Sequence, residues 1–225
     1  IYYGKMKDND GKVYRTVQIG NKIWMAENLR STRYRNGDLI SRKATAQEWA
    51  SQGTVGAWCY YDNDFRNDRL YGKLYNCYVI EDPRGIAPAG WRVPSYSDLV
   101  DLGDALGGAA IAGGAMKTTG TIESHKGLWY APNTGASNSS GFSALPSGLR
   151  NAAGAFEGKG THLNFWTSTL WDSYLDDNGI FQPLFLIGQL SSFDEIFLNA
   201  SSDIDWMSYS KPYGLSIRLV RDKNE

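Results

Sequence analysis

The chain has 225 residues, of which 42% are hydrophobic, and it includes eight Trp. A chain of this size buries enough surface to form a core without a metal ion or a disulfide, so we expect one domain over residues 1–225. The 23 basic and 24 acidic residues are interspersed and leave a net charge of −1, so we expect neither a nucleic-acid partner nor an anionic membrane surface.

The sequence contains no run of the roughly 20 apolar residues that cross a bilayer, so we expect no transmembrane segment. It begins at Ile1 without the charged and apolar regions of a signal peptide. A start at Ile is typical of a processed chain. We therefore expect that a signal or lipoprotein segment has been removed.

The first predicted element is a β-hairpin. Side chains alternate with a period of two along residues 13–19, and Gly20-Asn21 suits a tight turn. Residues 23–25 (IWM) then resume an extended run. The chain is therefore expected to open with paired strands.

Two helices are predicted. Residues 44–52 are rich in helix formers and are followed by Gly53, which suits a C-terminal cap. A second helix is predicted over residues 96–106, where Ser95 and Asp98 form a variant of the capping box. Its apolar face consists of Leu99, Leu102 and Leu106.

Two Gly-rich segments are predicted to be loops. Residues 107–120 (GGAAIAGGAMKTTG) lack the spacing of a phosphate-binding motif, so we expect a tight loop there. Residues 129–150 combine turn residues with recurring apolar residues, which predicts a long ordered loop rather than a flexible linker. The expected anchors are Trp129, Tyr130, Phe142, Leu145 and Leu149.

The later part of the chain predicts strands. Apolar or alternating patterns cover residues 165–169, 184–190, 195–199 and 214–221. In the last of these, Leu215, Ile217 and Leu219 are expected to face one way, and Ser216 and Arg218 the other. Strands at both ends, two central helices and long irregular segments indicate an α+β domain whose terminal strands pair.

Five motifs in order resemble the Fibrobacter succinogenes major paralogous domain family. They are residues 24–29 (WMAENL), 71–78 (YGKLYNCY), 90–95 (GWRVPS), 129–150 and 210–222. The resemblance implies a C-type lectin-like domain with small antiparallel sheets and long ordered loops. It also implies a bacterial protein that is secreted or anchored at the cell surface.

The two cysteines leave several alternatives open. From their spacing alone, Cys59 and Cys77 form a disulfide or remain two thiols. Relatives often carry a cysteine pair at the positions that are Ala87 and Leu219 here, so that bridge is missing. Relatives often have Trp where this chain has Cys77, and the resemblance therefore favours a small buried hydrophobic residue there.

Metal and cofactor sites are not expected. Calcium is the weaker alternative for one group of acidic and amide side chains, which lacks EF-hand spacing and more simply caps turns. This group is Asp62, Asn63, Asp64, Asn67 and Asp68. A second acidic group, which is equally well explained as a solvated rim, is Asp172, Asp176, Asp177, Asp203 and Asp205. His125 and His162 lack zinc-ligand spacing.

No catalytic residues are predicted. The chain has no GxSxG motif, although a catalytic triad assembles in space and leaves little trace in sequence. Formylglycine-generating enzymes have a similar fold, but their reaction depends on a cysteine pair near the end of the chain. No cysteine follows Cys77 here. We therefore expect no enzyme, because function follows from the site rather than from the fold.

The resemblance implies ligand contact through the late loops, which are diversified by retroelements in some relatives. Aromatic residues there alternate with short polar ones, as in recognition surfaces, although such rings also occur in cores. The predicted site residues are Trp171, Tyr174, Asp176, Asp177, Asn178, Asp203, Asp205, Trp206, Tyr209 and Tyr213. They predict a module that binds a protein or glycan. The alternative is a subunit of a cell-surface appendage, whose neighbour covers the same face.

Overall fold

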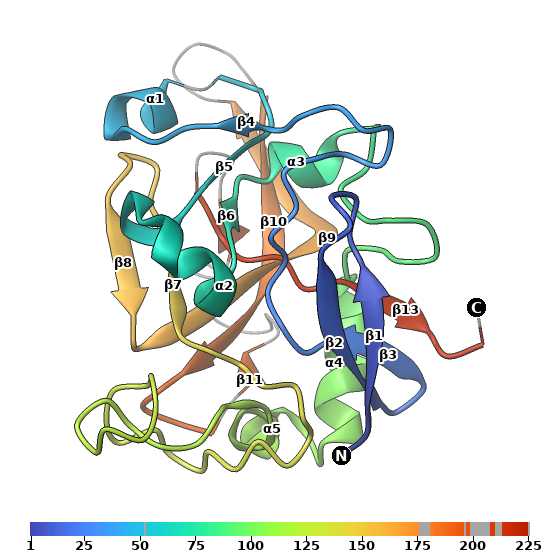
Figure 1. Cartoon of the computed structure of the whole chain (residues 1–225), viewed down its shortest axis with the longest axis vertical. Helices are drawn as coiled ribbons and strands as arrows, with labels where there is room; N and C mark the ends of the chain where they lie inside the picture. Colours follow the sequence, from blue (N-terminus) through green and yellow to red (C-terminus); the bar gives the residue numbers. More distant parts are fainter. Residues whose placement is uncertain (52, 176–180, 196, 199–207, 210–212, 225) are drawn as a thin grey trace.

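The computed structural model describes residues 1–51, 53–175, 181–195, 197–198, 208–209 and 213–224 (Figure 1). Within these residues the chain forms three β-sheets and five short helices, which confirms the predicted α+β class. Two helices were predicted and five are found. The additional ones are short or Gly-rich, so that their sequences carry little helical periodicity.

The first sheet joins the two ends of the chain. Its strands, in the order β1-β2-β3-β13, are β1 (Tyr3–Lys7), β2 (Val13–Ile19), β3 (Lys22–Met25) and β13 (Val220–Asp222). All neighbours are antiparallel, and Val220 lies opposite Trp24. The predicted hairpin is confirmed (Figure 1). The last strand joins the N-terminal sheet as predicted, but it pairs with β3 rather than with the first strand β1, because β2 and β3 lie between them.

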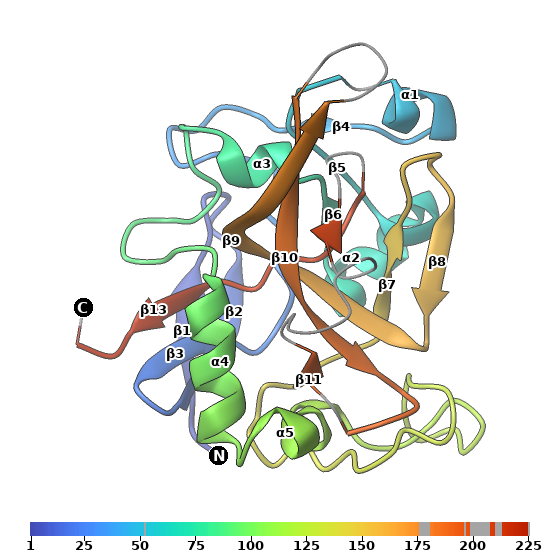
Figure 2. The same ribbon diagram turned by 180° about the vertical axis from the view of Figure 1, so that it is seen from behind.

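The second sheet is built around a long hairpin, which runs through the middle of the molecule (Figure 2). Its strands are β7 (Ser147–Arg150), β8 (Phe156–Lys159), β9 (His162–Leu175), β10 (Phe181–Ser191), β11 (Phe197–Leu198) and β12 (Ser208–Tyr209). Strands β9 and β10 contain the predicted strands 165–169 and 184–190 but are longer. The strand predicted over residues 195–199 contains β11, which covers Phe197–Leu198.

A small third sheet and three short helices are formed by residues 41–81, and the sheet strands β5 and β6 are buried in the core. The strands are β4 (Ser41–Arg42), β5 (Ala57–Cys59) and β6 (Leu74–Tyr75). The helices are α1 (Ala46–Ala50), α2 (Asp68–Tyr71) and α3 (Tyr78–Glu81), with 3-10 turns η1 (Tyr61–Asn63) and η2 (Phe65–Asn67). Helix α1 confirms the helix predicted within residues 44–52.

Helix α4 (Tyr96–Ala105) begins where the sequence predicted. Ser95 and Asp98 form the expected capping box, and the Asp98 carboxylate also accepts hydrogen bonds from Arg92. Leu99 and Leu102 are fully buried. None of the helices in the described part of the chain is by itself long and apolar enough to cross a bilayer.

Helix α5 (Ala109–Met116) corrects the prediction of a tight loop over residues 107–120. Its alanines favour a helix, whereas the internal Gly113 and Gly114 each cost about 1 kcal/mol relative to Ala. Packing explains why Gly114 is compatible with this helix, because a Cβ on it would lie 2.7 Å from the Gly135 carbonyl oxygen. The helix therefore forms where the 129–150 loop covers it.

The predicted loop over residues 129–150 is ordered and anchored, and it ends in strand β7. Trp129 and Phe142 are fully buried, and the Trp129 indole donates to Thr118 Oγ1 over 3.1 Å. The expectation that Tyr130 is an anchor was wrong, since its side chain is 44% exposed. Tyr130 lies instead against Gly160, where a Cβ would clash with the ring.

The strand predicted over residues 214–221 is confirmed only from Val220, where β13 begins, and Gly214, Leu215 and Ser216 form isolated bridges instead. Residues 214–220 are all buried, on both faces. Leu215, Ile217 and Leu219 face the main core cluster, as the alternation predicted. Ser216 and Arg218 point the other way but are also buried, at 0% and 1% exposure. The polar half of this alternation therefore marks a buried hydrogen-bonded layer rather than a solvated face.

The cysteines are not joined by a disulfide. Both side chains are buried, Cys77 in the main core cluster and Cys59 beside Trp49 and Tyr61. Burial raises the pKa of the Cys59 thiol to about 12. The disulfide alternative was therefore wrong, and Cys77 packs as a small hydrophobic residue.

We expect Asp98→Asn to lower the free energy of unfolding by roughly 2–4 kcal/mol at neutral pH, because the variant loses the ion pair with Arg92 and weakens the helix cap. Burial raises the pKa of Asp98, but hydrogen bonds from Arg92 and Ser95 outweigh it, so the pKa is lowered from 3.8. The stabilisation is therefore complete above pH 3.8 and is lost as the pH falls through the folded-state pKa.

Urea unfolding at neutral and acid pH measures this difference. The matched control is Asp104→Asn on the same helix, where the side chain is exposed. We expect this control to change stability by less than about 0.5 kcal/mol. Equal stability of the two variants at neutral pH would contradict the assigned role of Asp98.

Candidate functional site

The structure describes part of the predicted binding surface. Trp171 is 47% exposed on β9, whereas Tyr213 is partly buried and packs against the main core cluster. For Tyr174 in β9 and Tyr209 in β12 the backbone is described but the side chain is not. The predicted residues that lie outside the described ones are Asp176, Asp177, Asn178, Asp203, Asp205 and Trp206.

Trp171 occupies a β-bulge. Leu170 lies opposite Phe185 and Asp172 lies opposite Leu184, so Trp171 is the extra residue between two paired positions. Bulges bend a strand, re-aim its side chains and are frequent beside functional sites. Leu170 is also exposed, at 52%. Two large apolar side chains are thus presented on neighbouring positions of one strand.

The β9–β10 hairpin, which carries Trp171, is anchored in the core. Trp166, which lies earlier on β9, is fully buried, and its indole donates to the Tyr75 carbonyl oxygen over 2.7 Å. Its neighbour Thr167 is also fully buried, and its hydroxyl donates to the Leu186 carbonyl oxygen over 2.7 Å. These contacts hold the base of the hairpin rigidly beneath the exposed pair.

The acidic loop proposed as the weaker calcium candidate has its carboxylates paired with different cations. Asp64 pairs with Arg66 at 2.7 Å, and Asp68 pairs with Lys73 at 2.5 Å. Asp62 lies 3.6 Å from Lys159. Across the part of the chain that the structure describes, no group of three or more His, Cys, Asp or Glu side chains is arranged to hold a metal ion.

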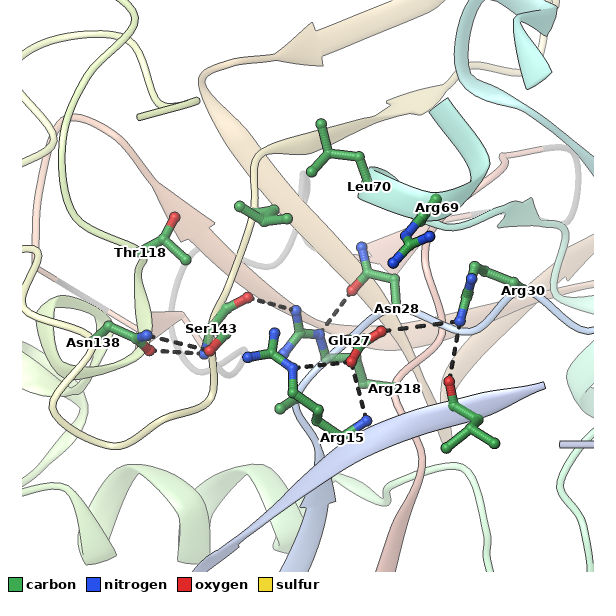
Figure 3. A pocket seen from close by; sticks show the side chains of 13 residues that line it. Arg15, Glu27, Asn28, Arg30, Arg69, Leu70, Thr118, Asn138, Ser143 and Arg218 are labelled. Atoms are coloured by element: carbon green, nitrogen blue, oxygen red, sulfur yellow. Dashed lines mark hydrogen bonds and ion pairs between the residues drawn. The ribbon is translucent and has the colours of Figure 1, made fainter. Parts of the chain in front are cut away.

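A polar cavity of about 650 Å³ lies on another part of the molecule (Figure 3). It opens between β2, the segment after β3, helix α2 and the loops around residues 118 and 138–145. The residues that line it are Val13, Arg15, Ala26, Glu27, Asn28, Arg30, Arg69, Leu70, Thr118, Asn138, Ser143, Leu145 and Arg218. None of them was predicted as a site residue.

Arg218 forms the floor of this cavity. Its Nε donates to Asn28 Oδ1 over 2.7 Å and its Nη2 donates to the Ser143 carbonyl oxygen over 3.1 Å, while Nη1 donates to the Phe142 carbonyl oxygen. Burial lowers the pKa of Arg218 to about 9, which still leaves the guanidinium charged at neutral pH. The floor is therefore positive and fixed.

Helix α2 reaches the cavity through a close approach of two backbones. It ends at Tyr71 and is capped by Gly72, whose φ is +76°, and a Cβ there would lie 2.7 Å from Asn28 Cβ and 3.0 Å from the Leu29 carbonyl oxygen. Asn28 Nδ2 also donates to the Tyr71 carbonyl oxygen over 2.8 Å. Glycine is thus required at this position, and it brings Arg69 and Leu70 to the rim.

The rim carries one carboxylate among its arginines. Glu27 Oε1 accepts from the backbone nitrogen of Arg15 over 3.0 Å and from Arg15 Nε over 3.1 Å. Glu27 Oε2 lies 4.0 Å from Arg30 Nη2. The Glu27 carboxylate therefore interacts with both Arg15 and Arg30. Because four arginines and one glutamate line the cavity, its net charge is positive.

Sequence reasoning missed this cavity because its parts are distant in the chain. Glu27 and Asn28 lie within the family-like motif at residues 24–29, and Arg218 lies on the polar half of the last predicted strand. The one sequence feature that pointed to this cavity was a charged residue, Arg218, between the large apolar residues Ile217 and Leu219. An arginine in such a strand either reaches solvent or pairs inside the protein, and sequence alone does not distinguish these outcomes.

Comparison with known proteins identified one family. The sequence profile described as the Fibrobacter succinogenes major domain matches residues 17–221. This match confirms the resemblance that the five motifs indicated. No curated protein and no solved structure matched the chain.

We expect Arg218→Lys to lower the free energy of unfolding by about 3 kcal/mol, because an ammonium group does not reproduce the planar fork that satisfies Asn28 and the loop carbonyls. The matched control is Arg69→Lys at the exposed rim, which we expect to change stability by less than about 0.5 kcal/mol. Urea unfolding measures both. A difference between the two variants below about 1 kcal/mol would contradict the structural role of Arg218.

Proposed function

Because the chain belongs to the Fibrobacter succinogenes major domain family, we propose that it is a bacterial ligand-binding module with a C-type lectin-like scaffold, secreted or held at the cell surface. The pairing of β3 with β13 supports this scaffold, since it brings the two ends of the domain together. The long ordered loop over residues 129–150 supports it as well. Such loops, carried on a rigid frame, are common places for binding residues.

The exposed bulge at Trp171 carries the binding proposal. A half-exposed indole next to exposed Leu170 is a large apolar contact surface, and Trp is enriched among residues that dominate binding energy. Its strand is anchored at Trp166, so little ordering is required when a partner binds. We propose that the partner is a protein or a glycan and that the other late residues of the predicted surface extend the contact.

We also propose that the module is not an enzyme and requires no cofactor. The reaction of formylglycine-generating enzymes depends on a reactive cysteine pair, whereas Cys59 and Cys77 are both buried. The raised pKa of Cys59 keeps its thiol protonated at neutral pH, and the thiolate is the nucleophilic form. The carboxylates of Asp62, Asp64 and Asp68 form ion pairs with lysine or arginine side chains of the protein itself.

The same exposed pair favours a second candidate, a subunit of a surface assembly. Leu170 and Trp171 would then be covered by a neighbouring copy or another subunit, because exposed apolar groups mark interfaces as well as ligand sites. The solution mass discriminates the two. A monomer at micromolar concentration supports ligand binding, and an assembly that Trp171→Ala dissociates supports the structural role.

We expect Trp171→Ala to weaken partner binding about thirtyfold, as for a residue that dominates an interface. Glycan arrays and surface-protein arrays probed with wild-type and variant protein measure the loss. Phe65→Ala is the matched control, since Phe65 is a 72% exposed aromatic residue on η2, outside the proposed surface. Equal binding by wild-type protein and Trp171→Ala would refute the assigned surface.

A further inference from the structure

We propose that the arginine-lined cavity between β2, α2 and the 118–145 loops is a second ligand site and that it binds an acidic saccharide of one or two sugar units. None of the described residues that line the cavity comes from β9 or β10, which carry the hairpin surface proposed above. The site is therefore an addition to that surface. It also differs in character, because it is concave and charged.

The cavity carries a local excess of positive charge. Arg15, Arg30 and Arg69 stand around the cavity and Arg218 forms its floor, whereas Glu27 is the one carboxylate among the described lining residues. The whole chain has a net charge of −1, so this local excess of positive charge is not a general property of the protein. A cleft of one sign with low-dielectric walls concentrates ligands of the opposite sign.

The Arg69 side chain at the rim has open hydrogen-bond donors. No hydrogen bond or ion pair of the exposed Arg69 guanidinium is found within the described part of the chain, and Figure 3 shows this side chain directed from α2 toward Asn28 and Arg30. Arg30 contributes charge rather than open donors, because its Nη2 already donates to the Val13 carbonyl oxygen over 3.2 Å and its guanidinium lies over the Tyr14 ring. A carboxylate, sulfate or phosphate group would bind the Arg69 guanidinium, since guanidinium forks match such anions.

The rest of the cavity lining combines neutral polar side chains with apolar ones. On the side opposite the arginines, Asn138 Nδ2 donates to Ser143 Oγ over 3.2 Å and Asn138 Oδ1 accepts from the Ser143 backbone nitrogen over 2.9 Å (Figure 3). The Asn138 amide keeps one N–H and one oxygen lone pair for ligand hydroxyl groups, whereas the buried Ser143 hydroxyl already donates to the Gly141 carbonyl oxygen. Leu70 is 45% exposed at the rim and offers an apolar contact for the face of a sugar ring. Hydroxyl-bearing anions fit this mixture better than a simple inorganic ion does.

The cavity also has the size and the fixed floor of a small-molecule site. A volume of about 650 Å³ lies within the range of small-molecule sites, which is about 300–1,000 Å³. The floor is held in place because Arg218 bonds to Asn28 and to the loop at Phe142 and Ser143. A site that needs little rearrangement loses less binding free energy on ordering.

Isothermal titration calorimetry tests the proposal on the intact protein. The acidic probes are galacturonate, galactose sulfate and galactose phosphate, which separate the three anionic groups. Galactose and inorganic sulfate and phosphate are the controls. We expect at least one acidic sugar to bind, and to bind at least tenfold more tightly than galactose and than either inorganic ion.

Variants then locate the site. Arg69→Gln and Arg15→Gln are each expected to weaken that binding at least tenfold. Arg66→Gln is the matched control, because Arg66 is an exposed arginine on the neighbouring turn η2 and does not line the cavity. Trp171→Ala should leave acidic-sugar binding unchanged, which keeps this test separate from that of the hairpin surface.

Four results would overturn the proposal. They are no heat with any acidic sugar at about 10 mM, equal binding of galactose, equal binding of an inorganic anion, or unchanged binding by Arg69→Gln. Circular dichroism and thermal unfolding of each variant ensure that a loss of binding is not a loss of folding. Failure here would leave the hairpin proposal intact, and failure of Trp171→Ala on the arrays would leave this one intact.

Discussion

The buried stretch at residues 214–220 is the constraint on which the rest of the structure depends. Its backbone pairs with β6 through Leu215 and Tyr75, with β7 through Gly214 and Arg150, and with β9 through Ser216, whose nitrogen donates to Asn164. Further on, the Ile217 carbonyl accepts from Leu29 and β13 joins β3. Parts of the chain that are far apart in sequence are thus tied to one segment near the C-terminus. Side chains on both faces of this stretch are buried, so both its apolar and its polar residues are shielded from solvent.

Arg218 shows how one side chain links fold and function. Inside the protein a guanidinium group is costly unless hydrogen bonds satisfy its donors, and Asn28 and the carbonyl groups of Phe142 and Ser143 do so here. These contacts attach the loop over residues 129–150 to the segment that follows β3, so the walls of the cavity are fixed by the same bonds that stabilise the core. Arg218, the positive floor of the proposed saccharide site, therefore also stabilises the fold. The rim arginines supply the additional positive charge.

The two proposed surfaces differ in the physics they use. The hairpin presents apolar area at Leu170 and Trp171 on a strand whose base is locked by Trp166, which suits an extended partner. The cavity is concave and charged, which suits a small anion. A module with both would hold two different ligands on one rigid frame. A local irregularity lies at each surface, the bulge at Trp171 and the close backbone approach at Gly72.

The sequence by itself determined the elements whose signals are local. The capping box at Ser95 and the alternation around the Gly20-Asn21 turn depend on neighbours within a few residues, so the α4 helix and the first hairpin follow from them. Only the tertiary structure decided that α5 is helical, because its Gly114 is compatible with close packing against a distant loop. The cavity was decided in the same way: its arginines come from four separate segments, and their charges combine only after long-range hydrogen bonds bring those segments together.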